Sequence, residues 1–130
     1  MRVLIILVFC LFATTLAAQN QLQRIDSLLV EADYEAVISQ VDLTSANDPS
    51  LSLQLGYRKA QALVRMGNLD DAARLLKELE GQANGLTVDK DFALALVNSV
   101  KGSLSMNQGR NDLAQEALEE ALEQFERSGR

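Results

Sequence analysis

The sequence contains no histidine and no tryptophan, and it has only one cysteine and one proline among 130 residues. Histidine is the most frequent general base in enzymes and a common metal ligand, so its absence leaves few routes to either kind of site. Basic residues are also scarce, 12 against 18 acidic ones, and the net charge is −6. Because nucleic-acid binding requires clustered lysine and arginine, a nucleic-acid partner is not expected.

Motifs for nucleophilic catalysis are missing as well. The sequence has neither Ser-x-x-Lys nor Gly-x-Ser-x-Gly, and it has no glycine motif that cradles phosphate. Glu116, Glu120 and Glu123 share one helical face, but a single helix cannot surround a cation, so we expect this face to be solvated. The sequence therefore predicts a protein that is not an enzyme and that holds no metal and no cofactor.

The N-terminal segment has the three parts of a secretory signal peptide. A basic residue, Arg2, is followed by an apolar run, and small residues precede the polar Gln19. We predict a signal peptide over 1–18 that is cleaved after Ala18, or one residue earlier, and an exported protein that is periplasmic or secreted. The alternative is an uncleaved anchor, although the apolar stretch 3–18 is short of the roughly 20 residues that a span needs.

Beyond this segment, apolar residues recur at intervals of three and four, which is the period of an amphipathic helix. Asp48 can cap a helix that begins with Pro49, and Gly67 and Gly109 can each end a helix in a left-handed conformation. A flexible loop is expected over 81–85. The expected helices span residues 19–31, 34–44, 49–66, 69–80, 88–107 and 111–127.

The expected helices form pairs that resemble one another. Both Gly67 and Gly109 are followed by an alanine five residues later and by a leucine four residues after that, and Ala60 or Gly102 stands seven residues before. The two small positions let the helices of a pair approach closely. Ala32 occupies the position of the glycine in a first, looser pair, and the offsets between the three pairs are 35 and 42 residues. Repeated units are predicted over about 19–47, 48–83 and 86–127.

This pattern resembles the tetratricopeptide repeat (TPR), a helix–turn–helix unit of about 34 residues. The residues that carry the resemblance are Ala60, Gly67, Leu69, Ala72, Leu76 and Leu79 in the second unit and Gly102, Gly109, Ala114, Leu118 and Ala121 in the third. The family's tryptophan and closing proline are absent, apart from Pro49 after the first unit. The resemblance implies an all-α domain over 19–130, three tandem repeats in a short right-handed α-solenoid. The alternative is a six-helix bundle.

The resemblance also implies a concave groove that is lined by the first helix of each unit and binds a peptide or helix of a partner protein. The partner-binding residues in this frame are Gln54, Tyr57, Gln61, Val64, Arg65, Leu96, Ser99, Ser103, Met106 and Asn107, completed by Asp26 and Leu29. Tyr57 is the best anchor because its ring offers apolar area with a polar tip, although packing between repeats would use the same ring. The family's clamp for terminal carboxylates is not expected, since Tyr57 and Gln61 replace its lysine and asparagine.

Basic residues on the expected first helices could favour an acidic peptide, or could serve solubility alone. They are Arg58, Lys59, Arg65 and Lys101. The last helix has to cover the end of the array, and its inward residues are expected to be Ala114, Ala117, Leu118, Ala121, Leu122 and Phe125, with Glu116, Glu119, Glu123 and Glu126 outward.

Taken with the resemblance, these features predict a non-enzymatic adaptor or scaffold of the bacterial cell envelope that holds a protein partner in its groove. Two alternatives remain open. One is a structural helical protein that associates with itself as a homo-oligomer. The other is the sensing or docking fragment of a longer signalling protein.

Overall fold

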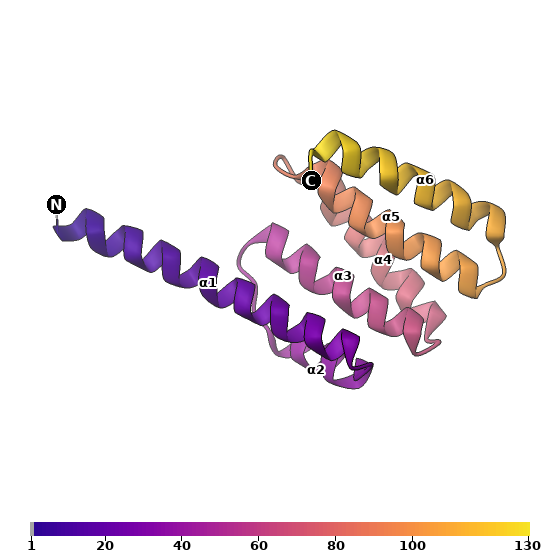
Figure 1. The fold of residues 1–130 in the computed structure, drawn as a ribbon, viewed down its shortest axis with the longest axis horizontal. Coiled ribbons are helices and arrows are strands. Elements are labelled where there is room, and N and C mark those ends of the chain that lie inside the picture. Colours follow the sequence, from indigo (N-terminus) through magenta and orange to yellow (C-terminus); the bar gives the residue numbers. More distant parts are fainter. Residues whose placement is uncertain (1) are drawn as a thin grey trace.

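The computed structural model describes the backbone of residues 2–130 and the side chains of residues 3, 5, 6, 8 and 16–130. Within this part the chain is all-helical, as expected, and has no strand (Figure 1). The helices are α1 (Arg2–Val30), α2 (Tyr34–Leu43), α3 (Pro49–Arg65), α4 (Leu69–Asn84), α5 (Lys90–Asn107) and α6 (Asn111–Ser128). Met1, the first residue of the predicted signal peptide, lies outside the described residues.

One turn joins the two helices of each pair, and the three turns have the same hydrogen bonds. Ala32, Gly67 and Gly109 have left-handed φ angles of +59°, +80° and +74°. In each turn, the N–H of the next residue donates to the carbonyl five residues before it: Asp33 to Leu28 (2.9 Å), Asn68 to Leu63 (2.9 Å) and Arg110 to Ser105 (2.8 Å). This is the Schellman arrangement, which satisfies carbonyls that a helix end leaves unpaired. The three hairpins therefore share one turn geometry at the predicted offsets.

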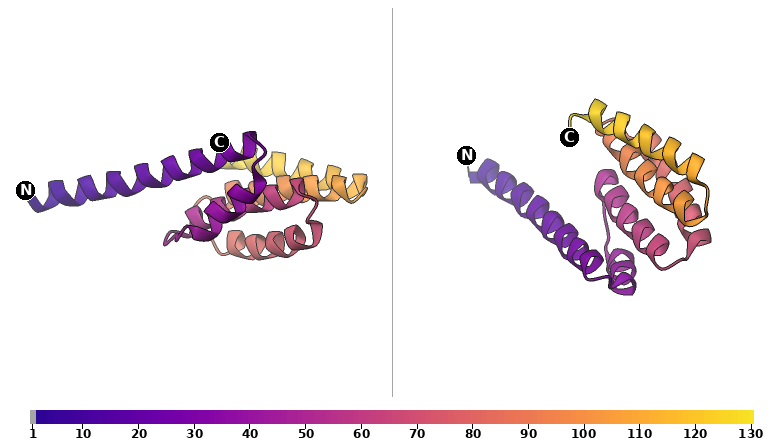
Figure 2. Two further views of the ribbon diagram at one scale, coloured as in Figure 1. Left: turned by 90° about the horizontal axis from the view of Figure 1, so that it is seen from below. Right: turned by 45° about the vertical axis from the view of Figure 1, so that its right-hand side comes forward.

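Each hairpin packs against the next one along the chain. α1 contacts α2 and α3, α3 contacts α2, α4 and α5, and α5 contacts α4 and α6. The first helices of the hairpins, α1, α3 and α5, are therefore neighbours in chain order. Figure 2 shows this succession from two further directions, with the N-terminal part of α1 extending away from the other helices.

Two clusters of buried side chains hold the hairpins together. The first joins Ile25 and Val37 to Leu55 and Ala62 of α3. The second joins α3 and α4 to α5 and consists of Leu53, Ala60, Leu63, Val64, Ala72, Leu76, Leu79, Ala83, Ala93, Val97, Val100 and Leu104. Gly102 lies where a close approach was expected, because a Cβ there would be 2.7 Å from the Leu118 side chain.

The start of α3 lies where the sequence predicts it, whereas the end of α4 lies beyond its predicted position. The Asp48 carboxylate accepts a hydrogen bond from the Ser50 N–H (3.2 Å), and Pro49 is the first helical residue. The prediction of a loop over 81–85 was wrong for the first four of these residues, because α4 continues to Asn84. Ala83, which is fully buried in the second cluster, extends the apolar face of the helix past the exposed Gly81.

The first helix is longer than the predicted helix 19–31. α1 runs without interruption from Arg2 to Val30, so the predicted signal segment and the first helix are continuous. The described apolar side chains of its N-terminal half are between 46% and 71% exposed; they are Val3, Ile5, Ile6, Val8 and Leu16. Among the described residues, none of the helices combines the length and the apolar character that crossing a membrane requires.

Candidate functional site

The predicted groove residues of α3 and α5 occupy corresponding positions. Because the turns at Gly67 and Gly109 have the same geometry, residues 42 apart in the two helices correspond. The pairs are Gln54 with Leu96, Tyr57 with Ser99, Gln61 with Ser103 and Arg65 with Asn107. Spacings of three and four place each set on one helical face, and all eight residues are at least partly exposed. We call these eight residues, with Gln19, Leu22 and Asp26 of α1, the first-helix surface.

Tyr57 has two roles on this surface. Its ring packs against the second buried cluster, and its hydroxyl accepts a hydrogen bond from Gln61 Nε2 (3.0 Å). Leu96 packs against the same cluster. Tyr57 and Leu96 therefore help to hold the hairpins together. Most of the accessible area of the first-helix surface belongs to polar groups.

The polar residues that α5 contributes are held by their own helix. The hydroxyl of Ser99 donates to the carbonyl of Leu96 (2.7 Å), and that of Ser103 donates to the carbonyl of Ser99 (3.4 Å). The Asn107 amide donates to the carbonyl of Ser103 (2.8 Å). Each of these side chains keeps an oxygen that can accept a further hydrogen bond from a ligand.

An ion pair joins α1 to α3 on this surface. Arg58 Nε lies 2.7 Å from Asp26 Oδ1, and Arg58 Nη2 lies 3.1 Å from Asp26 Oδ2. Arg58 also donates to the carbonyl of Gln54 (3.0 Å). Two further basic residues are paired, Lys59 with Asp42 (2.6 Å) and Lys101 with Glu80. Three of the four residues of the expected positive patch are thus neutralised by neighbouring carboxylates, which removes the basis for preferring an acidic peptide.

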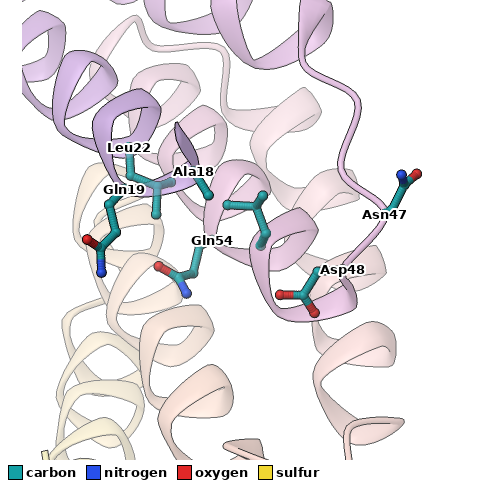
Figure 3. A pocket seen from close by; sticks show the side chains of 7 residues that line it. Ala18, Gln19, Leu22, Asn47, Asp48 and Gln54 are labelled. Atoms are coloured by element: carbon teal, nitrogen blue, oxygen red, sulfur yellow. The ribbon is translucent and has the colours of Figure 1, made fainter. Parts of the chain in front are cut away.

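A pocket of about 490 Å³ opens where α1 meets the start of α3. It is lined by Ala18, Gln19, Leu22, Asn47, Asp48, Leu51 and Gln54. Figure 3 shows the side chains of Gln19 and Gln54 extending in the same direction from the two helices, while Asn47 points away. Gln19 stands 35 residues before Gln54, the offset between the first two turns, so the two amides hold corresponding positions. Gln19 and Leu22 are not among the residues predicted from the sequence, although this offset identifies both.

Three of the predicted residues lie away from the first-helix surface. Val64 is only 3% exposed and belongs to the second buried cluster. Leu29 packs against the first cluster. Met106 lines a different pocket, together with residues of α6. The reason is geometric. Val64 and Met106 each stand one residue before a member of the first-helix surface, Arg65 or Asn107, and Leu29 holds the corresponding position in α1. Their side chains therefore turn away from that surface, toward the next hairpin.

The last helix is not oriented fully as expected. Ala114 and Ala121 are buried, each 3% exposed, but Leu118 and Leu122 are 40% and 60% exposed. Leu118 packs against Gly102 of α5 with one side and is open on the other, whereas Leu122 does not face inward as expected. Among the described helices, α6 contacts α5 alone, so its far side is left uncovered. One helix covers a narrower arc of its neighbour than two helices do.

The first-helix surface is suited to binding by hydrogen bonds. Side-chain amides present a donor and an acceptor together, which matches the N–H and C=O groups of a peptide backbone. Among the described side chains, no three His, Cys, Asp or Glu residues gather as a metal ion requires. Comparisons of the chain with protein-family models, with curated proteins and with solved structures find no match.

Proposed function

We propose that this chain is a non-enzymatic adaptor of the TPR type, which holds an extended segment of a partner protein on its first-helix surface. The observation that carries the proposal is the set of amides on three neighbouring helices, Gln19 on α1, Gln54 and Gln61 on α3, and Asn107 on α5. Such groups can bind the backbone of an extended peptide with little dependence on its sequence.

The repeated hairpins support the TPR part of the proposal. The turns recur at offsets of 35 and 42 residues. The first offset is close to the period of about 34 that defines the family, and the second is longer. Each hairpin contacts its neighbours in chain order, as a solenoid requires. On this reading the three hairpins form a short right-handed superhelix, and α1, α3 and α5 line its concave side.

Export by a cleaved signal peptide is the second part of the proposal. Its support is the set of exposed apolar side chains on the N-terminal half of α1. Cleavage after Ala18 would make Gln19, beside the pocket, the first residue of the mature protein. Mass spectrometry of the protein isolated from its native cells should find a chain that begins at Gln19 in the envelope or the medium. An intact Met1 on a cytoplasmic protein would contradict export.

Removing the amides tests partner binding. The triple variant Gln54→Ala, Gln61→Ala, Asn107→Ala takes three amides from the first-helix surface without changing the charge. At about 0.5–1.5 kcal/mol for each lost hydrogen bond, affinity for the captured partner should fall by about tenfold or more. The matched control is Gln23→Ala, Gln82→Ala, Asn84→Ala, which removes the same groups from exposed positions elsewhere.

The measurement is affinity capture from native envelope extract, followed by titration of the identified partner against the three proteins. Circular dichroism verifies that both variants are folded. A partner that binds the control as it binds the natural chain, and the triple variant much more weakly, supports the proposal. Equal binding to all three proteins would contradict it, as would the recovery of no protein except further copies of this chain.

A further inference from the structure

The outer side of the last hairpin presents an apolar surface. Met106 of α5 and Leu118 and Leu122 of α6 are 52%, 40% and 60% exposed. Together with Asn111, Ala114, Gln115 and Glu119 they line a pocket of about 480 Å³. We call these seven residues the end face. Large exposed apolar side chains that gather at one place mark an interaction site more often than scattered ones do.

The corresponding residues of the two earlier hairpins are covered by the next helix. Forty-two residues before Met106 and Leu118 stand Val64 and Leu76, which are 3% and 1% exposed because they pack with Val97, Val100 and Leu104 of α5. In the first hairpin the corresponding residues are Leu29 and Val41, which pack with Leu55 and Ala62 of α3. The end face is therefore the third copy of a surface that this chain twice covers with a helix.

One residue makes the end face more apolar than its counterpart. Leu122 corresponds to Glu80, which forms an ion pair with Lys101 of the covering helix. A glutamate at this position would serve solubility on an uncovered face, yet the chain places a leucine there that is 60% exposed. Leu122 therefore makes the apolar part of the end face larger than that of the corresponding surface in the second hairpin.

The charges around the end face define the chemistry of its occupant. Glu119 is one of the lining residues, and none of the seven is basic. Glu126 lies one helical turn beyond Leu122 and is exposed. We infer that the end face binds an amphipathic helix of another protein, with apolar residues spaced like those of α5 and with lysine or arginine beside them.

A second copy of this chain fits the end face less well. In a symmetric pair, the end face would meet itself and bring Glu119 and Glu126 of one copy against the same residues of the other. A head-to-tail pair would need an apolar face on α1, but the residues there that correspond to Val97, Val100 and Leu104 of α5 are polar and exposed; they are Asn20, Gln23 and Ser27. Both arrangements lack the complementarity that a basic amphipathic helix offers.

The probes are two synthetic peptides of 18 residues, labelled with fluorescein. Both carry the apolar residues of α5 at their positions in that helix, Ala93, Val97, Val100 and Leu104. The remaining positions combine alanine with lysine in one peptide and alanine with glutamate in the other. Fluorescence anisotropy measures their binding to the protein at low and high salt, and analytical ultracentrifugation measures its oligomeric state.

Two leucines of α6 provide a matched pair of variants. Leu122→Glu places a charge in the end face, whereas Leu113→Glu places the same charge at a leucine of similar exposure, 49%, that does not line this pocket. The lysine peptide should bind the natural chain and Leu113→Glu equally, and Leu122→Glu at least tenfold more weakly. Glu119→Lys should weaken binding of the lysine peptide, and raised salt should do the same.

Several outcomes would overturn the inference. These are no binding of the lysine peptide, equal binding to Leu122→Glu, and binding of the glutamate peptide as tight as that of the lysine peptide. A stable dimer that only Leu122→Glu dissociates would assign the face to a second copy instead. The end face shares no residue with the first-helix surface, so these results are independent of the adaptor proposal.

Discussion

Replacing Ala32 with glycine should stabilise the protein, whereas replacing Gly67 or Gly109 with alanine should destabilise it. All three residues have φ angles between +59° and +80°. This conformation costs an L-amino acid about 1–2 kcal/mol, and the added freedom of glycine in the unfolded chain costs about 0.5–1 kcal/mol. The difference predicts a gain of about 0.5–1 kcal/mol for Ala32→Gly and a similar loss for either glycine variant.

Steric contact does not complicate this comparison. A Cβ placed on Gly67 or Gly109 would have no heavy atom within 4 Å beyond the immediate chain neighbours. The same holds for Gly81, which lies inside α4 with ordinary helical geometry. Gly81→Ala should therefore stabilise the protein by about 0.5–1 kcal/mol, because alanine favours the helix. One substitution type then has opposite effects that depend on φ alone.

Thermal unfolding followed by circular dichroism measures these effects. For a domain of this size the expected differences correspond to shifts of about 2–6 °C in Tm. Ala32→Gly and Gly81→Ala should raise Tm, and Gly67→Ala and Gly109→Ala should lower it. A rise for Gly67→Ala as large as that for Gly81→Ala, or a fall for Ala32→Gly, would refute the shared turn geometry on which the register of the hairpins depends.

Two further predictions concern packing. Asn98→Leu removes the Nδ2 group that donates to Gln124 Oε1 (2.8 Å) in the buried contact between α5 and α6, and it should cost about 1–3 kcal/mol of unfolding free energy. Adding Gln124→Met should recover most of that loss in a double-mutant cycle measured by urea denaturation, and additive losses would argue against the buried pair. Gly56→Ala would bring a Cβ to 2.5 Å from Cδ2 of the buried Leu79, so it should destabilise the protein by about 1 kcal/mol or more. A gain in Tm equal to that of Gly81→Ala would show that Leu79 yields without cost.

The positions of the hairpins could be predicted because their turns depend on local chemistry. Gly67 and Gly109 mark left-handed positions, and Asp48 and Pro49 mark a helix start, so short sequence patterns locate these features. Ala32 was placed by its offset from Gly67 and not by its own preference. The structure gives it the same conformation as the glycines, at φ +59°.

Other features depend on contacts that sequence patterns do not contain. The segment 81–85 has the composition of a loop, but the burial of Leu79 and Ala83 keeps Gly81 helical. The periodicity of α6 indicates an apolar side for Leu118 and Leu122, but not whether another helix covers that side. The hydrogen bond between Asn98 and Gln124 was missed, because polar residues 26 apart carry no sign of pairing until the two helices are in contact.

The candidate site was predicted in part. The repeat offset places Gln54, Tyr57 and Gln61 at positions that correspond to those of Leu96, Ser99 and Ser103, and the structure leaves all six at least partly exposed on α3 and α5. It could not indicate that Asp26 and Arg58 neutralise each other, because that depends on the distance between α1 and α3. The partner that this surface binds is not determined by its amides, which recognise the peptide backbone in general.

The most direct measurement of partner binding is photo-crosslinking in the native cells. A photoreactive phenylalanine is introduced at position 61 or 103 on the first-helix surface, and at position 39 or 82 on the exposed sides of α2 and α4. Crosslinks to one partner protein from positions 61 and 103, and none from 39 and 82, are expected. Crosslinks that arise only from 39 and 82, or that join only copies of this chain, would contradict an adaptor that binds its partner along α1, α3 and α5.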